Sequence, residues 1–142
     1  MGTDAVKCVL LADRHHGLSE GIRGLLESEF EAVVMVADEA SLVASAVRMQ
    51  PSVVMADLGL AQSESFGWLR RLLARCPESR VIVLSAHDEL SVMRTAFEAG
   101  AAGFVWKRGI ASQLLEAVDA VLAGERYAPP GVAIPDSVPN TK

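Results

Sequence analysis

The sequence predicts an α/β fold with one parallel five-stranded sheet and helices on both of its faces. Five short apolar runs alternate along the chain with segments in which apolar residues recur at helical spacing. Two of these runs, Val53–Ala56 and Val81–Leu84, are apolar on successive residues, a pattern typical of parallel strands buried on both faces. Strands that alternate with helices form βαβ units, and right-handed crossovers then place helices on both faces of the sheet.

Each expected element follows from its own local pattern. The strand-like runs are Lys7–Ala12, Ala32–Ala37, Ser52–Ala56, Val81–Leu84 and Gly103–Trp106. The helical stripes run from Leu18 to near Phe30, from Leu42 to Met49, from Phe66 to Leu73, from Leu90 to Phe97 and from Leu114 to Leu122.

Residues that start or stop helices flank these stripes. Asp38 stands where a side chain can cap the second helix, which Pro51 stops. Pro77 ends the third helix. Gly100 and Gly124 occupy the positions at which glycine commonly closes a helix, here the fourth and the fifth.

The composition indicates one compact domain and excludes several classes of function. The chain has 142 residues, of which 51% are hydrophobic and 22% charged, enough to bury a full core. A net charge of −5 argues against binding of nucleic acid or an anionic membrane by this segment alone. Residues 1–7 lack the apolar stretch of a signal peptide, and no run approaches the ~20 residues that span a bilayer. We therefore expect a cytoplasmic protein whose Cys8 and Cys76 are reduced thiols, with a disulfide between them as the alternative.

The end of the chain differs from the rest. Between Tyr127 and Lys142 the chain has four prolines and no apolar periodicity. This pattern predicts a linker or tail over residues 129–142, and we expect a second domain beyond it.

Four of the strand-like runs lead into a polar residue: Asp13, Asp57, Ser85 and Lys107. Because the carboxyl ends of parallel strands meet at one edge of the sheet, these side chains should converge there. A carboxylate, a hydroxyl and an ammonium are the groups needed to form and sense an aspartyl phosphate. Taken alone, Asp57 is more simply explained as a turn cap and Ser85 as a strand-end hydroxyl. Their combination with Lys107 favours the phosphoryl site.

The stretches around these residues resemble the four signature blocks of bacterial response regulator receiver domains, which are CheY-like proteins. The matching stretches, in order, are 9–13, 53–57, 81–88 and 99–107. Residues 114–118 and 124–127 resemble the NarL/FixJ branch, whose receiver precedes a LuxR-type helix-turn-helix domain. The resemblance implies a flavodoxin-like fold with strand order 2-1-3-4-5 and a receiver domain over residues 1–128. It also implies a sensor histidine kinase partner, a homodimer, DNA binding only through the missing domain, and no enzymatic activity of its own.

The resemblance assigns roles to individual residues. Asp57 is expected to be the phosphoacceptor in a two-component transcriptional regulator, and Lys107 to pair with one phosphoryl oxygen. Ser85 is expected to donate its hydroxyl to another oxygen, and Phe104 matches the aromatic residue whose rotamer follows that serine. The alternative for Phe104 is an ordinary packing role.

The metal site implied by the family departs from the usual pattern. The resemblance places Mg²⁺ on Asp13, Asp57 and the backbone carbonyl of Gly59. Receiver domains normally have a second acid directly after the first, but Arg14 stands there. Replacing a carboxylate with a guanidinium removes an oxygen ligand and adds a like charge beside the cation, so we expect weak Mg²⁺ binding or none. A surface ion pair between Arg14 and Asp13 is an equal alternative.

Two functions follow from these expectations. The first is a phospho-switch in which phosphorylated Asp57 controls dimerisation and DNA binding by an attached domain. The second is an atypical receiver, independent of phosphorylation and controlled by a ligand or partner protein. A haloacid dehalogenase-type enzyme also uses an aspartyl nucleophile, but it needs a second acid where this chain has Gly59.

Overall fold

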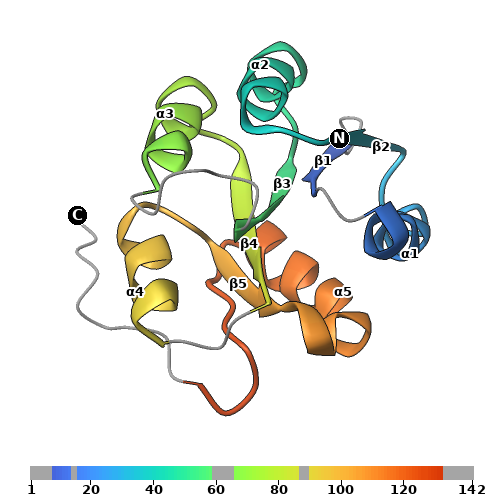
Figure 1. Cartoon of the computed structure of the whole chain (residues 1–142), viewed down its shortest axis with the longest axis vertical. Helices are drawn as coiled ribbons and strands as arrows, with labels where there is room; N and C mark the ends of the chain where they lie inside the picture. Colours follow the sequence, from blue (N-terminus) through green and yellow to red (C-terminus); the bar gives the residue numbers. More distant parts are fainter. Residues whose placement is uncertain (1–7, 14–15, 59–65, 87–89, 133–142) are drawn as a thin grey trace.

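The computed structural model describes residues 8–13, 16–58, 66–86 and 90–132 and confirms the expected sheet. Within this part of the chain, five strands form one sheet in the order β2-β1-β3-β4-β5, and every neighbouring pair is parallel. The strands are β1 (Cys8–Ala12), β2 (Ala32–Val36), β3 (Val53–Asp57), β4 (Arg80–Ser85) and β5 (Gly103–Trp106). Figure 1 shows them side by side at the centre of the molecule.

Helices cover both faces of this sheet. They are α1 (His16–Leu26), α2 (Glu39–Met49), α3 (Gly67–Arg75), α4 (Leu90–Glu98) and α5 (Ile110–Leu122), with a short 3₁₀ helix, η2 (Lys107–Gly109), between β5 and α5. Helices α1 and α5 pack on one face, and α2, α3 and α4 pack on the other (Figure 1). The strand order reverses at β1, and in open α/β sheets ligands bind beyond the carboxyl ends of the strands at such a point.

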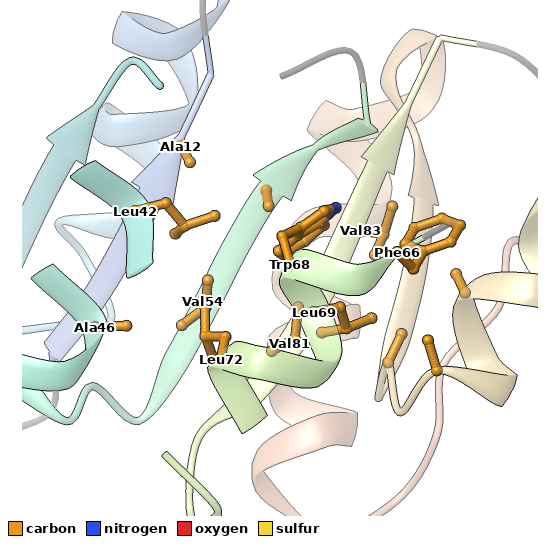
Figure 2. Packing of buried hydrophobic residues seen from close by; sticks show 14 of the residues in the cluster. Ala12, Leu42, Ala46, Val54, Phe66, Trp68, Leu69, Leu72, Val81 and Val83 are labelled. Carbon is orange, nitrogen blue, oxygen red and sulfur yellow. The ribbon is translucent and has the colours of Figure 1, made fainter. Parts of the chain in front are cut away.

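Strand residues alternate between two buried clusters, because successive side chains of a strand point to opposite faces. Leu10, Val54, Val83 and Phe104 belong to the cluster beneath α2, α3 and α4, here called the α2–α4 core. Their strand neighbours belong to the cluster beneath α1 and α5. Figure 2 shows side chains of α2 and α3 packed over β3 and β4 in the α2–α4 core.

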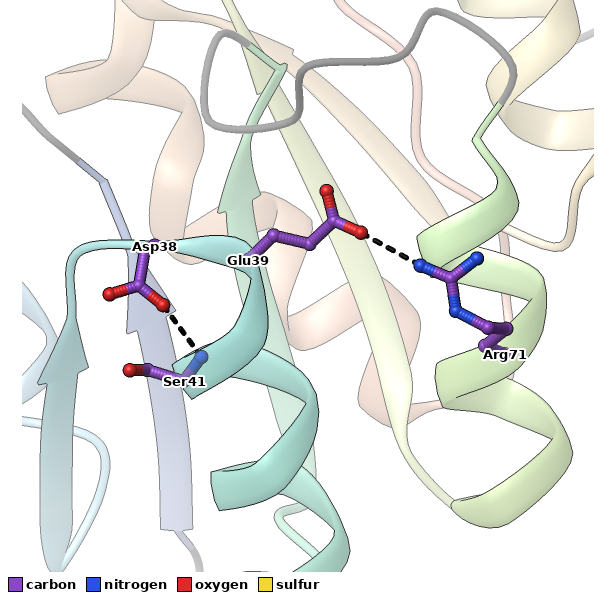
Figure 3. Close-up of polar contacts among 4 residues, drawn as sticks. All are labelled: Asp38, Glu39, Ser41 and Arg71. Atoms are coloured by element: carbon purple, nitrogen blue, oxygen red, sulfur yellow. Dashed lines mark hydrogen bonds and ion pairs between the residues drawn. The ribbon is translucent and has the colours of Figure 1, made fainter.

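Helix ends confirm the expected caps. The side chain of Asp38 accepts a hydrogen bond of 2.7 Å from the backbone N–H of Ser41 (Figure 3). This bond satisfies one of the backbone donors that the first turn of α2 leaves without a partner. Gly100 follows α4 with φ +113°, and a Cβ there would lie 2.6 Å from Cδ1 of Leu73. Glycine at that position therefore fits the positive φ and avoids displacing the Leu73 side chain.

Several boundaries differ from the sequence prediction. β3 and β4 each extend one residue further than expected, so Asp57 and Ser85 are the last residues of their strands. Helix α1 ends at Leu26 instead of near Phe30, although Phe30 is buried. Apolar periodicity does not locate these ends because a buried residue just after a helix continues the apolar stripe.

The chain after α5 is packed against the sheet at the point where a linker pattern begins. Tyr127 forms a parallel bridge with Gly103 of β5. Pro129 is buried, and Val132 packs against the α2–α4 core. Packing on the domain thus continues past residue 128 to at least Val132.

Two further observations agree with the composition. Cys8 and Cys76 are free thiols, and Cys76 is buried. None of the described helices has the length and apolar character to cross a membrane.

Candidate functional site

The site lies at the carboxyl edge of the sheet, where β3 presents Asp57. β3 occupies the middle of the sheet between β1 and β4, and its residues are all buried. Asp57 ends this apolar strand and is 3% exposed. A carboxylate in this position is held by a rigid strand and shielded from bulk water on most sides.

Lys107 connects Asp57 with Asp13. The Nζ atom of Lys107 lies 3.0 Å from Oδ1 of Asp57 and 3.2 Å from Oδ2 of Asp13. The side chains of Lys107, Asp57 and Asp13 are 9%, 4% and 0% exposed, so this cluster is buried. The lysine starts η2, directly after β5, and reaches past the end of β4 to the acids of β3 and β1. The predicted convergence of these three residues is confirmed.

The charges in this cluster are unequal. Two carboxylates face one ammonium, so these three residues leave an excess of one negative charge. A buried charge needs a partner, and the ammonium of Lys107 is shared by two acids that repel each other. An entering cation would offset this negative charge, whereas a phosphoryl group on Asp57 would add to it.

Ser85 occupies the neighbouring strand end. It is fully buried, and its Cα pairs with Trp106, the residue before Lys107. Leu84, one residue earlier, pairs with Asp57. The sheet register therefore sets the serine between the strand that carries the acid and the strand that leads to the lysine.

Phe104 lies deeper in the sheet, two residues before Trp106. It is fully buried in the α2–α4 core, in the same cluster as Met93 and Phe97 of α4. The alternation of β4 puts Ser85 on the same face as Val83, which also belongs to this cluster. Phe104 and Ser85 thus lie on the same face of the sheet, the face on which α4 packs.

The carboxylates of Asp13 and Asp57 are the oxygen ligands that the described part of the chain offers to a cation. No three or more His, Cys, Asp or Glu side chains of that part lie close enough together to hold one metal ion. Mg²⁺ commonly binds through one or two carboxylates and keeps several waters, so the pair meets its minimal requirement. The ammonium of Lys107, within 3.4 Å of both acids, competes for the same oxygens. Arg14 and Gly59, the other residues of the expected metal site, lie outside the described residues.

Trp68 is a residue near the site that the sequence analysis did not single out. It is 3% exposed in the first turn of α3, and it belongs to the α2–α4 core together with Ala56. Figure 2 shows Trp68 and Val83 in this core. Its buried Nε1 has no hydrogen-bond acceptor among the described residues. Trp68 follows two residues after Phe66, the first residue of the helical stripe, and the two rings are 6.3 Å apart. This aromatic pair at the start of the stripe was the signal in the sequence.

Comparison with known protein families agrees with this geometry. The family model described as response regulator receiver domain matches residues 9–119. The transcriptional activator protein ExaE of Pseudomonas putida is 36% identical over 131 residues, which are 84% of this chain and 56% of the relative. The transcriptional regulatory protein DegU of Brevibacillus brevis is 32% identical over 126 residues, or 87% of this chain and 53% of the relative. The chain therefore spans about half the length of these curated relatives.

Solved structures show the same architecture. The crystal structure of a LuxR-family two-component response regulator from Aurantimonas sp. SI85-9A1 matches with a TM-score of 0.80 and 28% identity. The match covers 89% of this chain and 91% of that chain.

Proposed function

This chain belongs to the response regulator receiver domain family, and from that premise we propose that Asp57 accepts a phosphoryl group from a sensor histidine kinase. The observation that supports this proposal most directly is the 3.0 Å ion pair between the buried Asp57 and Lys107. The domain then acts as the regulatory part of a transcriptional regulator. The kinase supplies the phosphoryl group.

The proposed reaction is a phosphoryl transfer between two side chains. An oxygen of Asp57 attacks the phosphorus of a phosphohistidine, the new P–O bond forms, and the P–N bond to the kinase histidine breaks. Such transfer depends on in-line positioning and on neutralisation of charge on the phosphoryl oxygens. Lys107 already contacts Asp57 and supplies one positive charge at the place where those oxygens arrive.

The response to phosphorylation would start at Ser85 and Phe104. The hydroxyl of Ser85 donates a hydrogen bond to a phosphoryl oxygen, which moves the serine toward Asp57. Phe104, fully buried beside α4, then repacks into the space that the serine leaves. The movement changes the surface formed by α4 and β5.

Asp13, Asp57 and the carbonyl of Gly59 are the proposed ligands of Mg²⁺. When bound, the cation neutralises charge on the incoming phosphoryl group. Because Arg14 replaces the second acid, we propose that its affinity is low and that Lys107 carries a larger share of the neutralisation.

The output of the switch is proposed to be dimerisation and DNA binding. The relatives are named as transcriptional regulators and are nearly twice as long as the matched region. We propose that a DNA-binding domain follows residues 129–142 and that exposed residues of α5, such as Leu122, form part of the contact between two copies. The chain itself is then a cytoplasmic switch and not an enzyme.

The substitution at Arg14 favours a second candidate, an atypical receiver that takes no phosphate. In that case the cluster of Lys107, Asp57 and Asp13 is a permanent structural element. A ligand or partner protein would then control the domain.

Treatment with acetyl phosphate and Mg²⁺, followed by intact mass measurement, separates the two candidates. We expect little phosphate adduct on the native chain, a clear gain in Arg14→Asp, and none in Asp57→Asn or Arg14→Asp/Asp57→Asn. Strong labelling of the native chain at ordinary Mg²⁺ concentration would contradict the role given to Arg14. A native adduct, however small, that Asp57→Asn abolishes would support the phosphoacceptor role. No adduct on the native chain would contradict that role and support the atypical receiver.

A further inference from the structure

After α5 the chain returns to the sheet and pairs with its edge strand, β5, through two backbone hydrogen bonds, here called one rung. Tyr127 donates its backbone N–H to the carbonyl of Ala102, and the N–H of Phe104 donates to the carbonyl of Tyr127, both at 3.0 Å. Gly124, with φ +88°, lies in the turn between α5 and this contact. β5 is otherwise the edge strand of the sheet, where exposed backbone groups can pair with another chain.

The sequence limits this pairing to a single rung. In a parallel ladder, alternate residues of the added segment bond to the edge strand, so the next donor after Tyr127 would be residue 129. Pro129 has no N–H and cannot donate. The segment is therefore attached to β5 but cannot become a full sixth strand.

Side chains of the same segment contact the elements around β5. The Tyr127 hydroxyl lies 3.2 Å from Oε1 of Glu116 on α5. The guanidinium of Arg126 lies 6.0 Å from the ring centroid of Phe97 on α4, a favourable cation–π distance. Ala128 and Val132 pack against the α2–α4 core. The segment is thus held by α4, β5 and α5 together.

The environment of Tyr127 supports a specific fit. A Cβ on Gly103 would lie 3.6 Å from Cβ of Tyr127, and also 3.2 Å from Cγ1 of Ile82. A distance of 3.6 Å is ordinary van der Waals contact, so Tyr127 lies directly against β5, and the tight contacts of such a Cβ would be with Ile82 and Val121. Burial raises the pKa of the Tyr127 phenol, and the Glu116 carboxylate raises it further. The phenol thus stays protonated and able to donate to Glu116 around neutral pH.

We propose that residues 126–132 form a clasp, a segment docked on the β5 edge, whose release transmits the state of the Asp57 site to the chain beyond it. This inference rests on the proposed function for its regulatory meaning. The two sites are close along β5. The backbone N–H of Phe104 donates a hydrogen bond to the clasp, and Lys107, three residues later, contacts Asp57. A shift of β5 toward a phosphoryl group would strain or break the two hydrogen bonds that hold Tyr127 on the strand.

Amide hydrogen exchange of the 142-residue chain, resolved residue by residue by NMR, tests docking first. We expect the amides of Phe104 and Tyr127 to be protected. Tyr127→Pro removes the donor to Ala102 and should raise exchange at Phe104 about fivefold or more, the effect expected from losing one hydrogen bond. Pro129→Ala restores a donor for the next rung and should slow exchange at Tyr127. Unprotected amides at both positions in the native chain would refute the clasp.

Matched variants test the coupling. Tyr127→Phe keeps the backbone rung and removes only the bond to Glu116, so it should change exchange less than Tyr127→Pro. Lys107→Gln and Asp57→Asn alter the Asp57 site without touching the clasp. If the two are linked, we expect either variant to change the exchange rate at Tyr127 about fivefold or more. Unchanged exchange in both variants would overturn the regulatory inference.

Labelling with acetyl phosphate is measured in parallel and separates this inference from the proposed function. If Asp57 takes label, Tyr127→Pro should label faster and Pro129→Ala more slowly than the native chain, and equal rates in all three would contradict the coupling. If no variant takes label, the phosphoacceptor role fails, while docking and coupling are still decided by hydrogen exchange.

Discussion

Lys107 stands between two carboxylates that come from different strands, and this single side chain organises the site. Its Nζ lies within 3.4 Å of both Asp13 and Asp57, and all three side chains are almost fully buried. Removing one member of a buried charged group leaves the other charges without compensation, which costs more than the group contributes when intact.

Lys107→Met is therefore expected to lower the free energy of unfolding by about 3–5 kcal/mol, since two buried acids lose the ammonium of Lys107. Asp13→Asn should be close to neutral or stabilising because it removes the repulsion between the acids. Urea denaturation measures both effects. The double variant Asp13→Asn/Lys107→Met should recover part of the loss, and a Lys107→Met protein as stable as the native one would contradict this account of the cluster.

Asp38 illustrates a residue whose role depends on its charge. The hydrogen bond from the backbone N–H of Ser41 lowers the pKa of the Asp38 carboxyl. A lowered pKa in the folded state adds stability above the ordinary pKa of 3.8 and loses it as pH falls through the folded-state pKa. The Asp38→Asn variant keeps an oxygen that can accept the capping hydrogen bond, but its side chain does not titrate.

Thermal unfolding between pH 7 and pH 3 checks this prediction. Asp38→Ala should lower the midpoint temperature of unfolding at pH 7, and Asp38→Asn should lower it less. The difference in midpoint temperature between the native chain and Asp38→Asn should become smaller as the pH approaches 3. A gap that is constant over this range would show that the charge of Asp38 adds nothing to the cap.

Helix ends show how local sequence and tertiary packing share control of the elements. Gly100 and Gly124 both have positive φ and both follow helices. Their surroundings differ: a Cβ at position 100 would lie 2.6 Å from Leu73, whereas a Cβ at position 124 meets no heavy atom within 4 Å. The sequence predicted both glycine caps from position alone, but it could not distinguish the crowded site from the open one.

Alanine substitutions at these two glycines form a matched pair. Gly124→Ala should cost about 1 kcal/mol, the penalty for a left-handed backbone with a side chain. Gly100→Ala should cost about 1 kcal/mol or more in addition, because the side chain of Leu73 must also move. Denaturant midpoints measure the difference. Leu73→Ala/Gly100→Ala should remove the clash, so the additional cost of Gly100→Ala should shrink in the Leu73→Ala background; equal costs at positions 100 and 124 would contradict the packing argument.

The charge of the whole chain leads to a prediction about DNA. The net charge of −5 opposes binding to a polyanion, so the chain alone should give no shift of duplex DNA in a mobility assay at physiological salt. A longer protein that continues past residue 142 into the proposed DNA-binding domain should bind. Salt-dependent binding by the 142-residue chain would assign DNA recognition to the receiver itself.

Much of the architecture could be predicted because its signals are local. Apolar runs on successive residues indicate buried strands, helical stripes indicate the covering helices, and polar residues at strand ends indicate a shared edge. Asp13, Asp57, Ser85 and Lys107 could be proposed together for this reason. Their resemblance to a known family supplied the order of the strands.

The contacts that give the site its chemistry needed the folded chain. The reach of Lys107 past β4 to both acids depends on strand spacing and side-chain conformation, neither of which sequence periodicity records. The sequence did not predict that Tyr127 docks on β5, because a proline-rich segment without apolar periodicity has the pattern of a linker. Local patterns specify which backbone conformation a segment prefers, whereas pairing between segments distant in sequence is decided by the edges and cavities that remain after the core has packed.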